Sequence, residues 1–201
     1  MKILKRPFGA YQTNCYVLQS PAGELIIDPG DGAFFWLKEV CKKPLAILNT
    51  HGHYDHVWDN DAVSLHFNAP IYIQKDDEFM LAGPFGQPPS RADVLLKDGD
   101  FIELEGFRLR LLHFPGHTPG CSAYLWDELL FSGDFLFAGS IGRYDFPYAS
   151  AELMLSSLER VAKERRDLRL LPGHGNESHL DAERESIGLW IKRIRRELGR
   201  V

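Results

Sequence analysis

Short apolar runs that end at glycine, proline, aspartate or asparagine recur along the chain, and their length is typical of β-strands. They predict strands at 14–18, 24–27, 45–48, 71–73, 101–104, 107–112, 122–126 and 129–131. Stretches with apolar residues three or four positions apart predict helices at 33–41, 56–67, 149–165 and 178–198. In the last helix one apolar face is expected to lie on a sheet; it is formed by Ile187, Trp190, Ile191, Ile194 and Leu198.

The order of these elements predicts the fold class. Strands come in groups rather than in strict alternation with helices, and helices occur in both halves of the chain. This order favours an α+β fold with two mixed sheets and helices on the outside over a barrel. A chain of 201 residues is expected to form one domain. The segment 76–100 is rich in glycine and proline, so a helical turn followed by an irregular loop is expected there.

Composition limits the possible partners and compartment. Hydrophobic residues make up 44% of the chain and charged residues 25%, which is typical of a folded protein. The net charge of -5 gives no attraction toward nucleic acid. The start of the chain lacks an apolar leader, and no apolar run is long enough to enter a membrane. The three cysteines are too few for a disulfide-stapled domain and are expected in the core, so a cytoplasmic location is predicted.

Five of the apolar runs end at an aspartate or a histidine. These residues are Asp28, His51, His117, Asp134 and His174. Sheets fix the positions of their strand ends, so side chains in the loops that follow are well placed to converge. The sequence therefore predicts one polar site built from distant segments.

The densest part of this pattern is the His-x-His-x-Asp-His motif at 51–56. His51 and His53 are two positions apart, point the same way in an extended segment and could share one ion. Asp55 and His56 open the next predicted helix and could reach a second ion. Histidine with carboxylate suits zinc, iron or manganese better than calcium.

The strand ends supply the residues that would complete both sites. His117 is expected to join His51 and His53, His174 to join Asp55 and His56, and Asp134 to lie between the two ions. So few protein ligands per ion leave a position for water or substrate, as catalytic sites do. The remaining histidines are expected to have structural roles only; they are His66, His113 and His179.

These motifs together resemble the metallo-β-lactamase superfamily. The resemblance rests on the histidine motif at 51–56, Pro-Gly-His at 115–117, Ser-Gly-Asp at 132–134 and Pro-Gly-His-Gly at 172–175, and it covers nearly the whole chain. Three further segments are most similar to the glyoxalase II-like, or hydroxyacylglutathione hydrolase-like, branch. They are Thr-Asn-Cys-Tyr at 13–16, Ile-Asp-Pro-Gly at 27–30 and the segment 139–146.

The resemblance implies an αββα sandwich with two divalent metal ions, most often zinc, at one edge. It implies the ligand roles given above, with Asp28 orienting the ligand loops and Arg143 near the glutathione part of a small-molecule substrate. Residues 1–201 would form a single domain without the additional C-terminal helical domain of glyoxalase II enzymes, since only 27 residues follow His174. Whether the protein is a monomer or a homodimer stays open.

Three functions are compatible with these features. The first is thioester hydrolysis by a metal-bound hydroxide, which Asp55 and Asp134 would hold and orient. The second is a mono-iron dioxygenase that acts on glutathione persulfide, although Pro-Gly-His-Gly at 172–175 favours the hydrolase. The third is a metal-stabilised module without activity, which fits poorly because structural zinc sites are dominated by thiolates. A flavodiiron-type redox site is disfavoured by His53, where that group carries glutamate.

Overall fold

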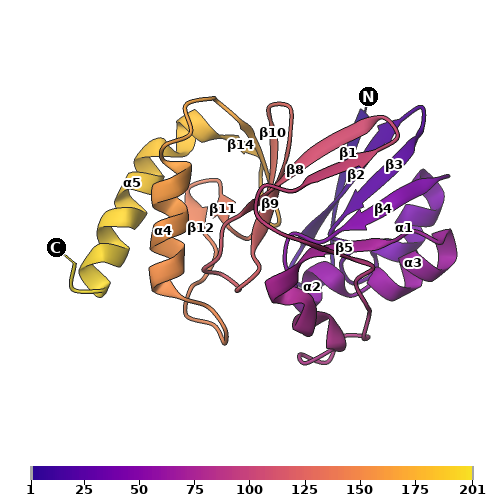
Figure 1. Ribbon diagram of the computed structural model, residues 1–201, viewed down its shortest axis with the longest axis horizontal. Helices are drawn as coiled ribbons and strands as arrows, with labels where there is room; N and C mark the ends of the chain where they lie inside the picture. The colour runs from indigo at the N-terminus through magenta and orange to yellow at the C-terminus, as the bar shows by residue number, and fades with distance from the viewer. Residues whose placement is uncertain (1, 201) are drawn as a thin grey trace.

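The chain folds into four layers, helix, sheet, sheet and helix, in the computed structural model, which describes residues 2–200 (Figure 1). In the first sheet the strands follow one another in chain order. They are β1 (Lys2–Phe8), β2 (Thr13–Ser20), β3 (Gly23–Ile27), β4 (Pro44–Leu48), β5 (Ile71–Gln74) and β6 (Val94–Leu96). The pairs from β1 to β3 are antiparallel and those from β3 to β6 are parallel. Helices α1 (Ala33–Val40) and α3 (Asn60–Phe67) cover the outer face of this sheet.

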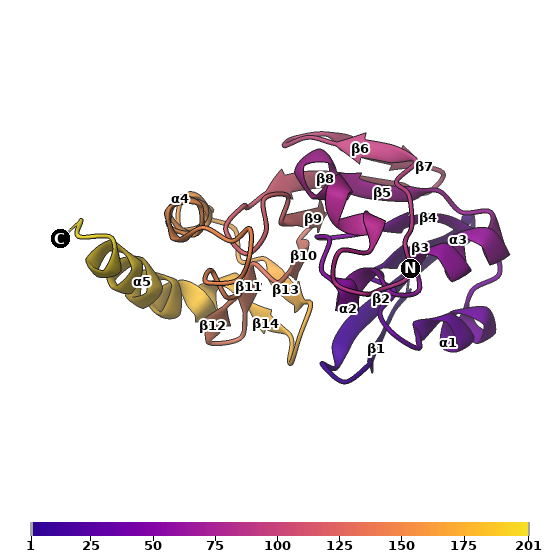
Figure 2. The same cartoon turned by 90° about the horizontal axis from the view of Figure 1, so that it is seen from below.

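The second sheet has the order β14-β13-β10-β9-β8-β7. Its strands are β7 (Phe101–Leu104), β8 (Phe107–His113), β9 (Ser122–Trp126), β10 (Leu129–Gly133), β13 (Arg169–Pro172) and β14 (Ser178–His179). Only the pair β10 and β13 is parallel. Helices α4 (Ala151–Val161) and α5 (Leu180–Glu197) lie outside this sheet, and Figure 2 shows them from below. The predicted fold of two mixed sheets flanked by helices is confirmed.

Alternation of side chains along the strands explains the layers. In β2, Tyr16 and Leu18 point into the apolar core between the two sheets, whereas Cys15 and Val17 point toward α1 and α3. All four side chains are at most 2% exposed. Both faces of the strand are therefore buried. Each such side chain contributes roughly 1.5–3 kcal/mol to folding, so the sandwich positions the strand ends rigidly.

Some elements differ from the sequence-based predictions. Strand β1, strand β6 and the small hairpin of β11 (Leu136–Phe137) and β12 (Ser140–Ile141) were not predicted. Strand β1 lies at the edge of its sheet with mostly exposed or half-buried side chains, so its sequence lacks a strong apolar pattern. The helical turn predicted at the start of segment 76–100 is present as the 3₁₀ helix η1 (Lys75–Ala82), but the loop predicted after it contains β6.

The helix predicted at 56–67 is divided into α2 (Tyr54–Val57) and α3. Asp59 lies at the break. Its backbone N–H donates to the carbonyl of Pro29, and its carboxylate accepts from the backbone N–H of Phe34 in α1. These contacts hold the chain between the two helices against the start of α1. One continuous helix over 56–67 therefore does not form.

Helix α5 packs its predicted apolar face beside α4 and near β12 and β14, rather than mainly on a sheet. The first two residues predicted for this helix form β14 instead and pair with β13. The three cysteines are free and buried, as expected. Within residues 2–200, none of the helices combines the length and the apolar character that crossing a bilayer demands.

Candidate metal centre

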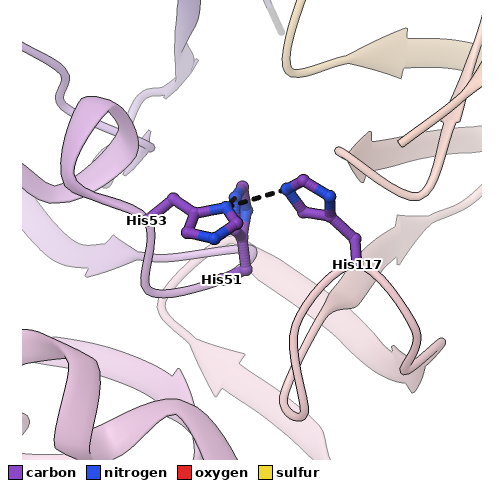
Figure 3. Close-up of side chains that lie close together, drawn as sticks. All are labelled: His51, His53 and His117. Atoms are coloured by element: carbon purple, nitrogen blue, oxygen red, sulfur yellow. Dashed lines mark hydrogen bonds between the residues drawn. The ribbon is translucent and has the colours of Figure 1, made fainter. Parts of the chain in front are cut away.

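Three histidines from the two sheets meet at one point. His51 and His53 follow β4 in the first sheet, and His117 follows β8 in the second. Nδ1 of His53 lies 2.8 Å from Nε2 of His117 and 3.1 Å from Nε2 of His51. Figure 3 shows the rings turned toward one another. Three imidazole nitrogens at this spacing could hold one metal ion, and we call these residues the three-histidine group.

A second group of ligating atoms lies beside the first. Asp55 and His56 are on α2, and His174 follows β13. Nε2 of His56 and Nε2 of His174 are 3.3 Å apart. Oδ2 of Asp55 lies 3.4 Å from the former and 3.3 Å from the latter. This mixed group of one carboxylate and two imidazoles could also hold a cation.

Asp134, which follows β10, lies between the two groups. Its Oδ2 is 3.5 Å from Nε2 of His117 and 3.3 Å from Nε2 of His174. Its Oδ1 is 3.3 Å from Nε2 of His56. The seven residues predicted as ligands therefore converge, with the predicted bridging aspartate in the middle. His66, His113 and His179 belong to none of the clusters found among residues 2–200.

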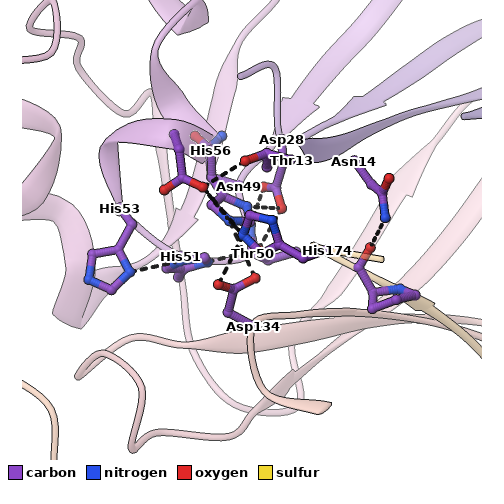
Figure 4. A network of polar contacts seen from close by, with 12 residues as sticks. Thr13, Asn14, Asp28, Asn49, Thr50, His51, His53, His56, Asp134 and His174 are labelled. Carbon is purple, nitrogen blue, oxygen red and sulfur yellow. Dashed lines mark hydrogen bonds and ion pairs between the residues drawn. The ribbon is translucent and has the colours of Figure 1, made fainter. Parts of the chain in front are cut away.

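Asp28 anchors the loop that carries this motif. Its carboxylate accepts hydrogen bonds from the backbone N–H and the hydroxyl of Thr50, and it lies 2.9 Å from Nδ1 of His56 (Figure 4). Nε2 of His56 is thereby turned toward the mixed group. Asp28 adopts a left-handed φ of 52°, a strained conformation for a residue other than glycine. The geometry is consistent with the orienting role predicted for Asp28.

Backbone carbonyls orient two further rings. Nδ1 of His117 lies 2.7 Å from the carbonyl of Arg143, and Nδ1 of His174 lies 2.9 Å from the carbonyl of Tyr11. With these nitrogens engaged, Nε2 of each ring faces the site. Metal-binding histidines commonly have such a partner on the other ring nitrogen.

The sequence analysis missed several of these partners. Thr50 lies 3.1 Å from Nδ1 of His51, and the hydroxyl of Thr13 donates to Oδ2 of Asp55 at 2.6 Å. Thr13 was noted only as part of a family resemblance. A backbone carbonyl carries no sequence signal, so the contacts from Tyr11 and Arg143 were not predictable.

The two groups differ in electrostatics. Burial, together with the neighbouring imidazoles, lowers the pKa of His51 far below its usual value and that of His53 to about 3. Both rings are therefore neutral and can offer a lone pair to a cation. In the mixed group, burial would lower the pKa of His174, but hydrogen bonds to Asp134 and Asp55 outweigh it and raise the pKa to about 9. A cation bound there must displace a proton.

The carboxylate of Asp134 tests whether the site suits a cation. Its Oδ1 is the one buried side-chain nitrogen or oxygen atom, among those of residues 2–200, that has no hydrogen-bond partner. Burial would raise the pKa of this carboxyl, but His56 and His174 hold it well below its usual value, so it stays ionised. An orphaned anionic oxygen among imidazole nitrogens is the environment that a divalent ion would satisfy.

A cavity of about 490 Å³ opens onto both groups. Its walls are largely aromatic outside the ligand cluster and include Tyr11, Tyr54, Phe85 and Phe146. Arg143 is also at the mouth, with 63% of its side chain exposed. Its guanidinium forms two 2.8 Å hydrogen bonds to Asp145 and lies 4.2 Å from the centre of the Phe146 ring.

Comparison with known proteins identifies the family. A sequence profile of the metallo-β-lactamase superfamily matches residues 8–174. The chain belongs to the metallo-β-lactamase superfamily. It is 33% identical to the hydroxyacylglutathione hydrolase GloC of Haemophilus influenzae, over 90% of this chain and 93% of the relative. It is 34% identical to the probable metallo-hydrolase YqgX of Bacillus subtilis, over 92% of this chain and 95% of the relative.

Several solved structures are similar to this chain. The BLEG-1 B3 metallo-β-lactamase superposes with a TM-score of 0.83 at 32% identity, over 92% of this chain and 97% of the other. TTHA1623 in a di-iron-bound form superposes with a TM-score of 0.77 at 32% identity, over 91% of this chain and 98% of the other. ETHE1 from Myxococcus xanthus superposes with a TM-score of 0.79 over 96% of this chain and 85% of the other. At 23% identity, this similarity supports the fold alone. The chain is thus a member of a superfamily of metal-dependent hydrolases, and its His and Asp cluster fits the divalent metals that the superfamily binds.

Proposed function

We propose that the protein is a metal-dependent hydrolase of thioesters with two ion sites. The three-histidine group would hold one ion, the mixed group the other, and Asp134 would bridge them. The observation that carries this proposal is the convergence of seven ligating side chains around the ionised, unpartnered oxygen of Asp134, at the floor of an open cavity. An open cavity over the ligands is a feature of catalytic rather than structural metal sites.

Two divalent ions would supply Lewis acidity for the thioester carbonyl and lower the pKa of the attacking water toward neutrality. Asp55 and Asp134 would hold and orient this water. The pKa of both carboxyls is held below its usual value despite burial, chiefly by His56, so both accept hydrogen bonds rather than donate them. Water adds its oxygen to the acyl carbon, the C–S bond breaks and the thiol leaves as thiolate. The proton passes to solvent or to the thiolate.

The residues at the mouth of the cavity, together with one relative, suggest which thiol the thioester substrate carries. The GloC relative is named for hydroxyacylglutathione hydrolysis, which supports a glutathione thioester as the substrate. Arg143 is the cationic side chain at the mouth and would face a glutathione carboxylate. Asp145 already pairs with this exposed guanidinium, so we expect Arg143 to make only a modest contribution to substrate binding.

A second candidate is dioxygenation of a glutathione persulfide with a single iron. The three-histidine group supports it because its three imidazoles could hold one ion without the mixed group. The complete mixed group favours the hydrolase, because a single-ion enzyme would not need Asp55, His56 and His174 to converge as well.

Elemental analysis paired with two assays tests the proposal. Two metal equivalents per chain, with turnover of S-lactoylglutathione followed by loss of thioester absorbance, is the expected result. One iron per chain with oxygen uptake on glutathione persulfide, and no thioester turnover, would replace the first candidate by the second.

A further inference from the structure

Asp77, in the 3₁₀ helix η1, is a fully buried carboxylate close to the metal centre. It accepts three hydrogen bonds. The backbone N–H of Gly52 and the hydroxyl of Thr118 donate to Oδ2 at 2.9 and 2.7 Å, and the backbone N–H of Gly120 donates to Oδ1 at 2.6 Å. Asp77 belongs to none of the clusters that could hold a metal ion among residues 2–200.

The donors come from the two loops that form the three-histidine group. Gly52 lies between His51 and His53, and Thr118 follows His117 directly. The first loop extends from β4 in one sheet, and the second connects β8 and β9 in the other. One side chain from a third element therefore joins both loops.

Packing supports a specific fit of η1 between these loops. A Cβ added to Gly52 would lie 2.5 Å from Cβ of Met80, and one added to Gly120 would lie 2.7 Å from the backbone nitrogen of Asp77. Neither glycine leaves room for a side chain, so the backbone of both loops packs directly against η1. Placing an ionised carboxylate in the interior is costly without such compensating hydrogen bonds.

We propose that Asp77 is a positioning residue that fixes the distance between the His51–His53 loop and His117, and thereby the metal affinity of the three-histidine group. Its three hydrogen bonds go to Gly52, Thr118 and Gly120, so it acts through residues next to the ligand histidines. The mixed group has separate supports, because Asp28 contacts His56 and Thr13 contacts Asp55. Loss of the Asp77 contacts should therefore affect one ion and spare the other. This inference rests on the two-ion site of the proposed function but not on its substrate.

Asp77→Asn is the primary test. The three donors surround both carboxylate oxygens, so an amide must turn its NH₂ group toward at least one N–H or O–H donor and lose that bond. We expect zinc binding at one of two sites to weaken about 10- to 100-fold, the usual effect of removing an outer support of a ligand. Zinc affinity is measured by competition with a chromophoric chelator.

Glu24→Gln is the matched control. Glu24 is also a buried acid, and its carboxylate accepts from the backbone N–H groups of Lys42 and Lys43. It lies at the start of β3, whereas Asp28 and the site follow the other end of that strand. Both N–H groups bond Oε2, which the amide oxygen of glutamine can replace, so the variant loses a buried negative charge but neither bond. Both zinc affinities are expected to be unchanged.

Two further variants keep the test decisive. Thr118→Val removes one donor and retains the shape of the side chain, so a smaller weakening at the same site is expected even if Asp77→Asn folds poorly. In a His117→Ala background, which already disables the three-histidine group, adding Asp77→Asn should leave the remaining zinc affinity unchanged.

Equal weakening of both sites, or no weakening in Asp77→Asn and Thr118→Val, would overturn the positioning role. Such a result with two zinc ions still bound by the wild type would leave the proposed function intact. A wild type that binds no zinc, iron or manganese would instead remove the basis of both.

Discussion

At the scale of single residues, Gly173 shows how closely the chain approaches the metal centre. A Cβ at this position would overlap Oδ1 of Asp134 and lie 2.7 Å from Cε1 of His56. Gly173→Ala must therefore displace one of the bridging or mixed-group side chains. We expect metal affinity and thioester turnover to fall about 10- to 100-fold, measured by chelator competition and steady-state kinetics.

Gly188 in α5 provides the control for this substitution. No heavy atom lies within 4 Å of a Cβ built there. Gly188→Ala should raise stability by up to about 1 kcal/mol through helix propensity and leave turnover unchanged. Similar turnover for wild type and Gly173→Ala would contradict the described approach of this loop to Asp134.

The histidines of the two groups predict a difference in pH dependence. His174 has a raised pKa of about 9, so below that pH a bound cation must displace its proton. His53 has a lowered pKa of about 3 and stays neutral down to acidic pH. From pH 8 to pH 6 the affinity of the mixed group should fall about tenfold per pH unit for each displaced proton, while that of the three-histidine group should fall less, because His51 and His53 stay neutral over this range. Zinc titrations at both pH values measure this, and parallel changes in the two affinities would argue against it.

At the scale of elements, β2 supports the loop after β13. The side-chain amide of Asn14 donates to the carbonyls of Pro172 and Gly175, on both sides of His174. Asn14→Ala would leave the carbonyl of Gly175 without this donor, whereas the carbonyl of Pro172 keeps the hydroxyl of Tyr16, and the loop would be held less firmly. We expect a loss of about 1–3 kcal/mol in the free energy of unfolding, measured by urea denaturation, together with weaker binding of one ion.

Gln19→Ala on the same strand is a suitable comparison, because its amide donates to the carbonyl of Val40, away from the site. A stability loss without a change in metal binding is expected for Gln19→Ala. If Asn14→Ala behaved in the same way, the side chain of Asn14 would have no part in placing His174.

The elements also show what the sequence could predict. Strands buried on both faces, such as β3 and β4, were predictable because continuous apolar runs end at turn residues. The metal-centre residues were predictable for the same reason, since His51, Asp134 and His174 follow such strands. Edge strand β1 and the break at Asp59 were not, because they depend on pairing and hydrogen bonds between distant segments. The role of Asp77 was equally hidden, since its donors are mostly backbone groups.

At the scale of the whole molecule, the metal centre joins the two halves of the sandwich. His51, His53, Asp55 and His56 come from the side of the first sheet, and His117, Asp134 and His174 from the second. Ions held by both sides stabilise the folded state by mass action. Free metal at about 1,000 times its dissociation constant contributes roughly 4 kcal/mol, or about 8–16 °C in Tm for a chain of this size.

Removal of metal by a chelator should therefore lower Tm by about this amount, and added zinc should restore it. Differential scanning calorimetry of the same sample before and after dialysis measures the change. A His53→Ala, His174→Ala double variant should show little response to the chelator. An unchanged Tm in the wild type would mean that the two sheets hold together without help from ions.

The burial of the cysteines has a consequence for the thioester hydrolysis proposed here, which would release thiols. Burial raises the pKa of the Cys41 thiol to about 12 and those of Cys15 and Cys121 well above their usual value. Exchange with a disulfide requires a thiolate that the other molecule can reach. Oxidised forms of the leaving group would therefore find no partner for a mixed disulfide on this chain, and the protein should keep its activity through many turnovers in an oxidising thiol pool.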